Sequence, residues 1–236
     1  MVRAKHEVPS GGKAERTRQQ IVDTALAMFR EHGYEATSMR AIAEGAGVSL
    51  GNAYYYFKSK EHLVQEFYAL THAEHLAACE VVLAKERDLG KRLRHVLRAK
   101  ITTAEPYHHF SAVLFKTAAD PKSPLNPFSP QSQAVRKEAT ALMERVLDGS
   151  DAKVPKDLRE QLPELLWLYE MSVVLFWLHD ESPKRARTLR LIDHTVDLVT
   201  KLISVASFPL MRPLRKSTLE LLAQLKADIE PPKSGD

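Results

Sequence analysis

Apolar residues recur every three to four positions through most of the 236-residue chain, and no stretch between turn signals alternates apolar with polar residues. A spacing of three to four residues is typical of amphipathic helices. Alternation of apolar and polar residues is typical of strands, and it does not occur here. The pattern therefore predicts an all-α fold. Beyond a helical N-terminal quarter, the predicted helices span approximately 60–86, 88–104, 107–119, 131–147, 157–180, 184–207 and 214–228.

Three short helices are predicted in the N-terminal quarter. Phe29 lies on the apolar face of the first helix, and Gly33 provides a left-handed stop after it. Ser38 and Ser49 are suitable N-caps for the second and third helices, which are separated by a tight turn containing Gly47. Two short helices around a glycine-containing turn are typical of a helix-turn-helix DNA-binding unit.

The third of these helices contains three consecutive tyrosines, which cannot all point in one direction. Ala53 and Phe57 lie one turn apart and are predicted to face the core. Tyr54 and Tyr55 are then expected to face solvent, while Tyr56 leans on its own domain. Outward tyrosines next to a basic segment favour a polyanionic partner.

Charge and composition support this interpretation. The net charge is +4, and residues 1–60 contain nine Lys/Arg against six Asp/Glu, so most of the basic excess lies beside the tyrosines. Cys79 is the single cysteine, and the polar N-terminus has no secretory signal, which predicts a cytoplasmic protein. The longest apolar stretch, 165–178, is too short to span a membrane. Residues 1–13 and 231–236 are predicted to be disordered tails.

The segment TSMRAIAEGAGVSLGNAYYYFKSKEHL (37–63) resembles the DNA-binding segment of the tetracycline-repressor (TetR) family of bacterial transcription regulators. Its A-G-V-S turn, G-N-x-Y-Y-x-F helix and S-K-E-x-L exit occur together in register, and the resemblance covers about residues 14–65. It implies a DNA-binding domain at 14–60 and a ligand-binding and dimerisation domain at 61–230. It further implies a homodimeric, nucleoid-associated repressor that leaves a palindromic operator when a small effector binds.

The resemblance assigns DNA contacts to the starts of the second and fourth helices and to the exposed face of the third. With two arginines beside the N-terminal tail, the predicted DNA-binding set is Arg16, Arg18, Ser38, Met39, Arg40, Ser49, Leu50, Gly51, Asn52, Tyr54, Tyr55 and Lys60. Asn52 can pair bidentately with adenine, and Lys60 is expected to contact a phosphate. Leu50 and Met39 replace polar residues that many relatives carry, so the operator sequence cannot be taken from those relatives.

Two later helices are expected to form the dimer interface. The stretch 165–178, within helix 157–180, is apolar on nearly every side and must be buried all round. Helix 184–207 has two adjacent apolar stripes, wide enough for the subunit core and a partner together. The stripes are Leu191, Thr195, Leu198, Leu202 and Val205, and Ile192, Val196, Val199, Ile203 and Ala206. The prediction is a four-helix homodimer interface, and the alternative is a monomer core.

An effector pocket is expected among the long helices, although each of its residues can equally be an ordinary core residue. The predicted ligand-binding set is Tyr107, Phe110, Leu114, Phe115, Phe128, Trp167, Glu170 and Met171. Such a lining favours a hydrophobic or planar ligand. Phe128 and Leu125, on the proline-rich loop 121–130, are expected to fold back, with Phe128 as a lid. Three roles are open for the Glu170 side chain: it binds a cationic ligand, it pairs with a basic group at the interface, or it reaches water.

Enzymatic chemistry has no support in the sequence. The pairs His72/His75 and His108/His109 lack a third ligand at metal-site spacing, and no nucleotide-binding glycine motif occurs, so no metal or cofactor is predicted. The competing class is a helical module that uses its basic N-terminus on RNA or a membrane. The deep, narrow major groove of duplex RNA does not admit a reading helix. A membrane-binding helix needs a strongly apolar face, which residues 49–60 lack.

Overall fold

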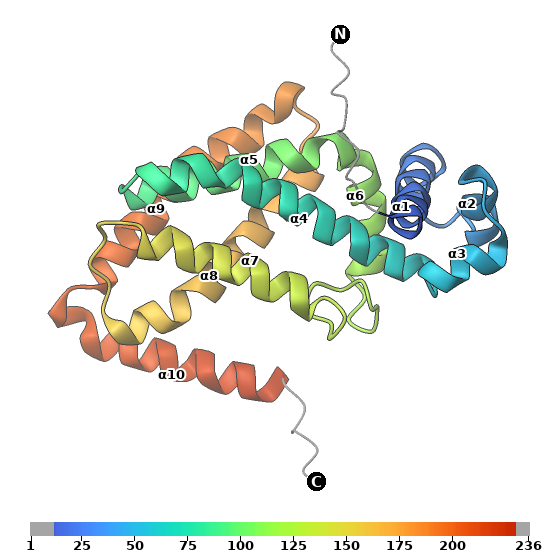
Figure 1. Cartoon of the computed structure of the whole chain (residues 1–236). Coiled ribbons are helices and arrows are strands. Elements are labelled where there is room, and N and C mark those ends of the chain that lie inside the picture. The colour runs from blue at the N-terminus through green and yellow to red at the C-terminus, as the bar shows by residue number, and fades with distance from the viewer. Residues whose placement is uncertain (1–11, 230–236) are drawn as a thin grey trace. The chain divides into compact units, whose positions relative to one another are not determined.

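The computed structural model describes residues 12–229, and every regular element in that range is a helix (Figure 1). The predicted all-α fold is confirmed. The α-helices are α1 (Lys13–His32), α2 (Met39–Gly45), α3 (Leu50–Tyr56), α4 (Lys60–Lys85), α5 (Leu89–Ala104), α6 (His108–Ala118), α7 (Gln133–Asp148), α8 (Lys156–Leu178), α9 (Ala186–Ala206) and α10 (Arg212–Ile229). The predicted tails lie outside the described residues, except that α1 already begins at Lys13.

The described residues form two compact units. The first contains residues 12–71 and 107–133, and the second contains residues 72–106 and 134–229, so α4 runs from one unit into the other. The domain boundary expected from the sequence, between residues 60 and 61, falls at the start of α4. The division into a DNA-binding and a ligand-binding domain at that position stays a prediction.

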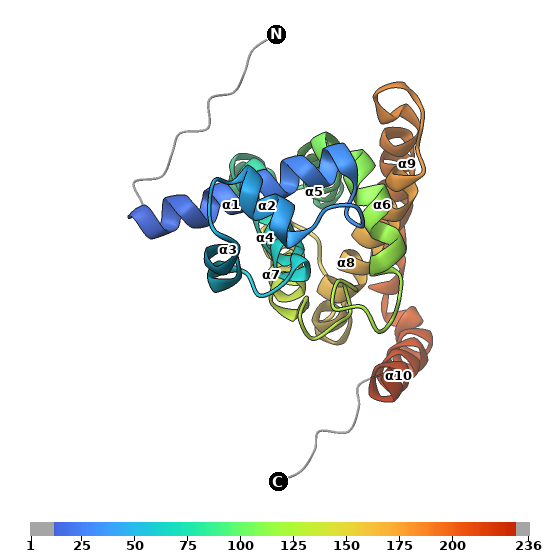
Figure 2. The same ribbon diagram turned by 90° about the vertical axis from the view of Figure 1, so that its right-hand side faces the viewer.

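In the first unit, α2 lies beside both α1 and α3 (Figure 2). The apolar face of α1 is fully buried at Ile21, Ala25 and Phe29, as the helical spacing predicts. The ring of Phe29 stacks on that of Phe110 from α6, with 5.5 Å between centroids. A Cβ added at Gly45 in α2 would lie 3.0 Å from the Thr24 side chain of α1, so the absence of a side chain there lets the two helices approach closely.

The end of α1 differs from its prediction in one detail. The Gly33 N–H donates to the Phe29 carbonyl at 3.1 Å, and its φ of 85° is positive, as expected for a glycine stop. Its ψ of 161° is extended, however, so the residue does not adopt the predicted left-handed helical conformation. The chain therefore leaves α1 in an extended direction towards α2.

The proline-rich loop at 121–130 packs on the first unit through one of its two predicted anchors. Leu125 is fully buried, as expected, but Phe128 is 59% exposed. The prediction that Phe128 folds back as a lid is therefore wrong. The loop is held by polar contacts instead, because Gln65 Nε2 donates to the Pro124 carbonyl at 2.9 Å, and Ser129 Oγ donates to the same oxygen at 2.9 Å.

The second unit buries one side of α8 and one stripe of α9. Trp167, Val173 and Trp177 of α8 are each less than 5% exposed, and Ile192 and Val196 of α9 are fully buried beside them in one core. Several other apolar side chains of both helices are exposed, so the second unit alone does not cover all of the apolar surface that the sequence places on them.

Candidate functional site

The third helix presents the face that the sequence predicts. Ser49 caps α3, its Oγ accepting a hydrogen bond from a first-turn N–H at 3.1 Å. Ala53 is fully buried and Phe57 is 3% exposed, so the expected buried face is confirmed. On the opposite face Tyr55 is 80% and Tyr54 48% exposed. Both phenols are thus available to a partner outside the chain.

The other exposed residues of α3 complete this surface. Gly51 and Asn52 are exposed on the first turn, which leaves room for close approach to the backbone and gives access to the Asn52 amide. Tyr56 is half-buried, and its ring meets that of Tyr55 edge-on at 5.2 Å. Leu50 is also half-buried, because it packs against the core of the unit. Only part of its side chain can reach a ligand.

A tight turn fixes α3 relative to α2. Gly47 has a φ of 64°, a left-handed value that disfavours residues with a side chain. The Val48 N–H donates to the Ala43 carbonyl at 2.9 Å, and Ala46 is almost fully buried beneath the turn. The presented face of α3 is therefore held by the turn within this unit.

The start of α2 has two exposed polar residues and one buried apolar one. Ser38 is an exposed N-cap that accepts from the Ala41 N–H at 3.1 Å, and Arg40 is exposed as the second residue of the helix. Met39 is only 7% exposed and packs in the core. Its side chain is therefore not placed to contact DNA, and a contact of Met39 with DNA through its backbone stays a prediction.

Two of the predicted DNA-binding cations make contacts inside the first unit. Arg18 donates to Glu66 at 3.0 Å and lies over the ring of Phe57. Lys60 donates to the Tyr34 carbonyl at 2.8 Å, with its ammonium 4.3 Å from the ring centroid of the same residue. Both cations therefore contribute to stability here, and their contact with phosphate stays a prediction. Arg16, by contrast, is exposed on α1.

The predicted ligand-binding residues are distributed over the cores of both units. Phe110 and Leu114 are buried in the first unit, where Tyr107 packs edge-on against Phe67 at 4.9 Å. Phe115 is half-buried in the same unit, whereas Trp167 and Met171 belong to the core of the second. This packing agrees with the alternative that each is a core residue.

Glu170 of α8 does not reach water, because it is only 2% exposed. Its Oε1 lies 3.7 Å from Nζ of Lys100 on α5, which no sequence pattern singled out. Burial raises the pKa of the Glu170 carboxyl, and the Lys100 charge opposes that shift. The expectation that Glu170 reaches water is thus wrong, and its basic partner lies within the same chain.

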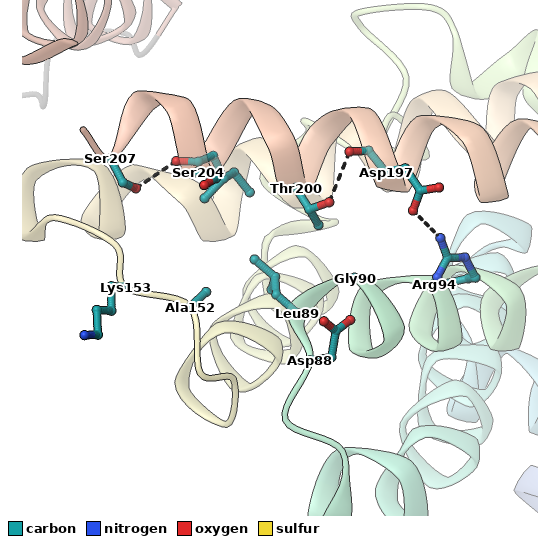
Figure 3. Close-up of a pocket in the computed structure, with 11 residues that line it drawn as sticks. Asp88, Leu89, Gly90, Arg94, Ala152, Lys153, Asp197, Thr200, Ser204 and Ser207 are labelled. Atoms are coloured by element: carbon teal, nitrogen blue, oxygen red, sulfur yellow. Dashed lines mark hydrogen bonds and ion pairs between the residues drawn. The ribbon is translucent and has the colours of Figure 1, made fainter. Parts of the chain in front are cut away.

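A hollow of about 370 Å³ lies in the second unit, between the start of α5 and the later half of α9 (Figure 3). Its lining is about equally polar and apolar, and Arg94 reaches Asp197 at 2.6 Å along its wall. The lining residues are Asp88, Leu89, Gly90, Arg94, Ala152, Lys153, Asp197, Thr200, Ile203, Ser204 and Ser207. None belongs to the predicted ligand-binding set, and the sequence gives no signal for this hollow.

Two further searches cover the part of the chain that the structure describes. No helix within residues 12–229 is both long and apolar enough to cross a membrane. Across the same residues, no three or more His, Cys, Asp or Glu side chains gather as a metal site requires.

Comparison with known proteins identifies the class to which this fold and helix-turn-helix belong. Residues 21–67 match the family model of the tetR family of bacterial regulatory proteins, and residues 92–219 match the tetracyclin repressor-like C-terminal domain. The second match alone covers more than half of the chain. The chain therefore belongs to the tetR family.

Relatives and solved structures agree with this assignment. The HTH-type transcriptional repressor KstR2 of Mycobacterium tuberculosis is 30% identical over 115 residues, which are 46% of this chain and 54% of KstR2. KstR of Mycolicibacterium smegmatis is 49% identical over 55 residues, covering 23% of this chain and 27% of KstR. The chain thus spans about half, or less, of the length of these curated relatives.

Two crystal structures show the same fold over most of the chain. A tetR-family transcriptional regulator from Streptomyces coelicolor has a TM-score of 0.60 at 23% identity, covering 90% of this chain and 97% of that one. Thermus thermophilus FadR, a TetR-family transcriptional repressor in complex with lauroyl-CoA, has a TM-score of 0.54 at 22% identity, with 78% and 92% coverage.

Proposed function

We propose that the protein is a sequence-specific DNA-binding transcription regulator with α3 as its recognition helix. One observation carries the proposal: α3 buries Ala53 and Phe57 while it presents Tyr54 and Tyr55 to solvent, beside a short capped α2. A helix held in this way can enter the major groove of B-DNA. The relatives KstR2 and KstR are named transcriptional repressors, and we extend repression to this chain.

The exposed residues around α3 divide between base reading and backbone contact. Asn52 presents an amide that can pair bidentately with adenine, and Gly51 lets the helix approach the groove closely. The tyrosine hydroxyls can reach phosphates while their rings contact thymine methyl groups. Ser38, Arg40 and Arg16 are exposed and are assigned to the phosphate backbone, which provides affinity without reading sequence.

We further propose that the regulator is a homodimer formed through α8 and α9. Their outward apolar side chains are at least a third exposed, although the removal of apolar groups from water is favourable. The exposed residues are Leu168, Leu175 and Phe176 of α8, and Leu198, Leu202 and Val205 of α9. A two-fold dimer places two recognition helices on a palindromic operator, with half-sites about 34–36 Å apart or a multiple of that distance.

A small effector is proposed to control DNA binding. The T. thermophilus FadR structure contains lauroyl-CoA, and this chain shares its fold, which supports a small-molecule effector; we assign its site to the helical core of the second unit. The effector releases DNA only if it binds the DNA-incompetent conformation of the dimer more tightly than the competent one. Repression relieved by such a ligand is the form of regulation that we propose.

Replacement of one exposed tyrosine tests the assignment of α3. We expect Tyr55→Ala to weaken binding to a duplex selected by the parent protein at least about fivefold, because a buried groove contact is worth about 1–3 kcal/mol. The matched control is Val81→Ala, which alters a side chain that is 68% exposed on α4 in the second unit. Equal affinity of Tyr55→Ala and Val81→Ala would show that α3 does not read DNA.

A further inference from the structure

Three buried polar side chains and one partly buried lysine lie near one another in the second unit. His72 and His75 lie one turn apart on α4, with ring centroids separated by 6.3 Å, and both are at most 1% exposed. Lys100 of α5 and Glu170 of α8 form the ion pair described above. The Lys100 charge acts on both imidazoles and on the Glu170 carboxyl. We call these four residues the polar cluster.

The hydrogen-bonding state of His75 follows from its geometry. Its Nε2 lies 2.9 Å from the Val96 carbonyl oxygen, which can only accept, so Nε2 must carry a proton. Burial, with a contribution from Lys100, lowers the pKa of His75 to about 3, so the ring is neutral and has no second proton. Nδ1 of His75 is therefore an acceptor, and it receives no hydrogen bond from the protein.

Other atoms of the polar cluster also lack partners. Neither ring nitrogen of His72 makes a hydrogen bond, because its nearest carboxylate oxygen, on Glu138, lies 3.8 Å from Nε2. Oε2 of Glu170 is buried and unpaired as well. A buried polar atom without a partner loses its hydrogen bonds to water without replacement, so such groups are ordinarily satisfied by protein, water or ligand. Several in one place indicate a site for a polar group from outside the chain.

The charges of the polar cluster indicate that the polar group it binds is neutral. Burial, with a smaller effect of Lys100, lowers the pKa of His72 to about 4, so both imidazoles are neutral. The Lys100–Glu170 pair has no net charge when both groups are ionised. A charged ligand would enter without a counter-ion, at a large desolvation cost. A hydroxyl is neutral, donates one hydrogen bond and accepts others. It can therefore donate to the unpaired Nδ1 of His75 and accept from the N–H of His72.

We propose that the polar cluster binds the hydroxyl group of a neutral, largely apolar alcohol or phenol, and that this molecule is the class of effector. The second part rests on the proposed function, whereas the binding of a hydroxyl does not. The surrounding core, which includes Leu97, Leu166 and Val173, provides the apolar contacts for the rest of the molecule. An apolar site with a few convergent polar groups is typical of small-molecule recognition.

Three probes with one ring system test the proposal: naphthalene, 2-naphthol and 2-naphthoate, each titrated calorimetrically into the full-length protein at neutral pH. We expect 2-naphthol to bind about tenfold or more tightly than either other probe, since one satisfied buried hydrogen bond is worth about a factor of ten. In His75→Phe this preference over naphthalene should fall below about threefold. His95→Phe is the matched control, because His95 bonds the Ala78 carbonyl and lies outside the polar cluster.

A second variant keeps the shape of the site and changes its charge. Glu170→Gln leaves Lys100 without its counter-ion, so the affinity of 2-naphthoate relative to 2-naphthol should rise about tenfold or more. A purely structural role of Glu170 does not produce this shift. Equal affinities of 2-naphthol and naphthalene in the parent would show that the cluster holds water only. That result, binding of none of the probes, or an unchanged ratio in Glu170→Gln would overturn the proposal.

Binding to operator DNA, measured with and without 2-naphthol, separates this inference from the proposed function. If 2-naphthol binds with the expected dependence on His75 but DNA affinity is unchanged, the hydroxyl site stands and its role as effector site fails. If the protein binds DNA but no hydroxylated probe, the hydroxyl site fails and the DNA-binding function stands.

Discussion

The guanidinium of Arg92 fills the space beside Gly149, where an added Cβ would lie 2.2 Å from its Nη2 atom. Arg92 is 1% exposed, and its nitrogens donate to four backbone carbonyls near the ends of α4 and α7. The acceptors are those of Leu83 (2.8 Å), Glu86 (2.5 Å), Arg145 (2.6 Å) and Val146 (2.7 Å). One side chain therefore satisfies carbonyls that two helix ends leave unpaired.

Gly149→Ala should destabilise the second unit, because its methyl group displaces Arg92 from these carbonyls. Overpacking of this kind costs about 1–3 kcal/mol, and we expect the free energy of unfolding to fall by that amount. Urea denaturation followed by circular dichroism measures the change. Gly51→Ala, where nothing lies within 4 Å of the added Cβ, is the matched control and should cause no loss of stability. Equal midpoints for both variants would contradict the role of Arg92.

Asp180, just after α8, should make stability depend on pH. Its carboxylate accepts from the Ser182 N–H at 2.9 Å and from the Thr188 N–H and hydroxyl at 2.8 and 2.6 Å. Burial alone would raise the pKa of Asp180, but these hydrogen bonds lower it well below its usual value. A carboxyl with a lowered folded-state pKa adds stability that is complete above its unfolded pKa and is lost as the pH falls.

We therefore expect Asp180→Asn to lower the free energy of unfolding by about 1–2 kcal/mol at neutral pH. The difference from the parent should shrink as the pH falls below about 4, the pKa of an unfolded aspartate. Parallel urea titrations at pH 7 and pH 3 provide the comparison. A difference that stays constant between these two values would show that the Asp180 charge is not responsible.

Arg40→Ala should weaken DNA binding without affecting stability, because Arg40 is exposed near the start of α2. Loss of one phosphate contact lowers the slope of log affinity against log salt by about one. Arg190→Ala removes the same charge from an exposed position on α9 and should leave the slope unchanged. Affinities measured at several salt concentrations distinguish the two variants, and identical slopes would remove Arg40 from the interface.

Leu202→Glu should disrupt the proposed dimer. Leu202 is 57% exposed on α9, and an unpaired carboxylate buried between subunits carries a large desolvation cost. We expect the dimer dissociation constant to rise about 100-fold or more, as measured by analytical ultracentrifugation. Val81→Glu places the same charge on a more exposed valine of α4 and should leave the dimer intact. Dimerisation unaffected by Leu202→Glu would place the interface elsewhere.

Features that depend on neighbouring positions in the sequence are predictable. Helix spacing, the caps at Ser38 and Ser49, and the buried Ala53 and Phe57 all follow from local periodicity and hydrogen-bonding chemistry, and the structure confirms them. The turn at Gly47 belongs to the same class, because a positive φ favours glycine.

Features that depend on partners far along the chain are not predictable in this way. Met39 lies at a helix start that the sequence predicts to be exposed, yet the packing of the first unit buries its side chain. From the sequence, Lys60 is expected to contact a DNA phosphate, yet the Tyr34 carbonyl, 26 residues away, accepts its hydrogen bond. The spacing of His72 and His75 was visible, but their missing partners become apparent only once α5 and α8 are in place.

The central claim is that a dimer of this protein reads a palindromic duplex through α3. The most direct measurement is selection of bound duplexes from a random library by the full-length protein, followed by sequencing. We expect an inverted repeat with half-site centres about one helical turn, or a multiple of it, apart. We also expect Tyr55→Ala to lose that enrichment. A library that yields no enriched motif, or the same motif with Tyr55→Ala, would contradict the account.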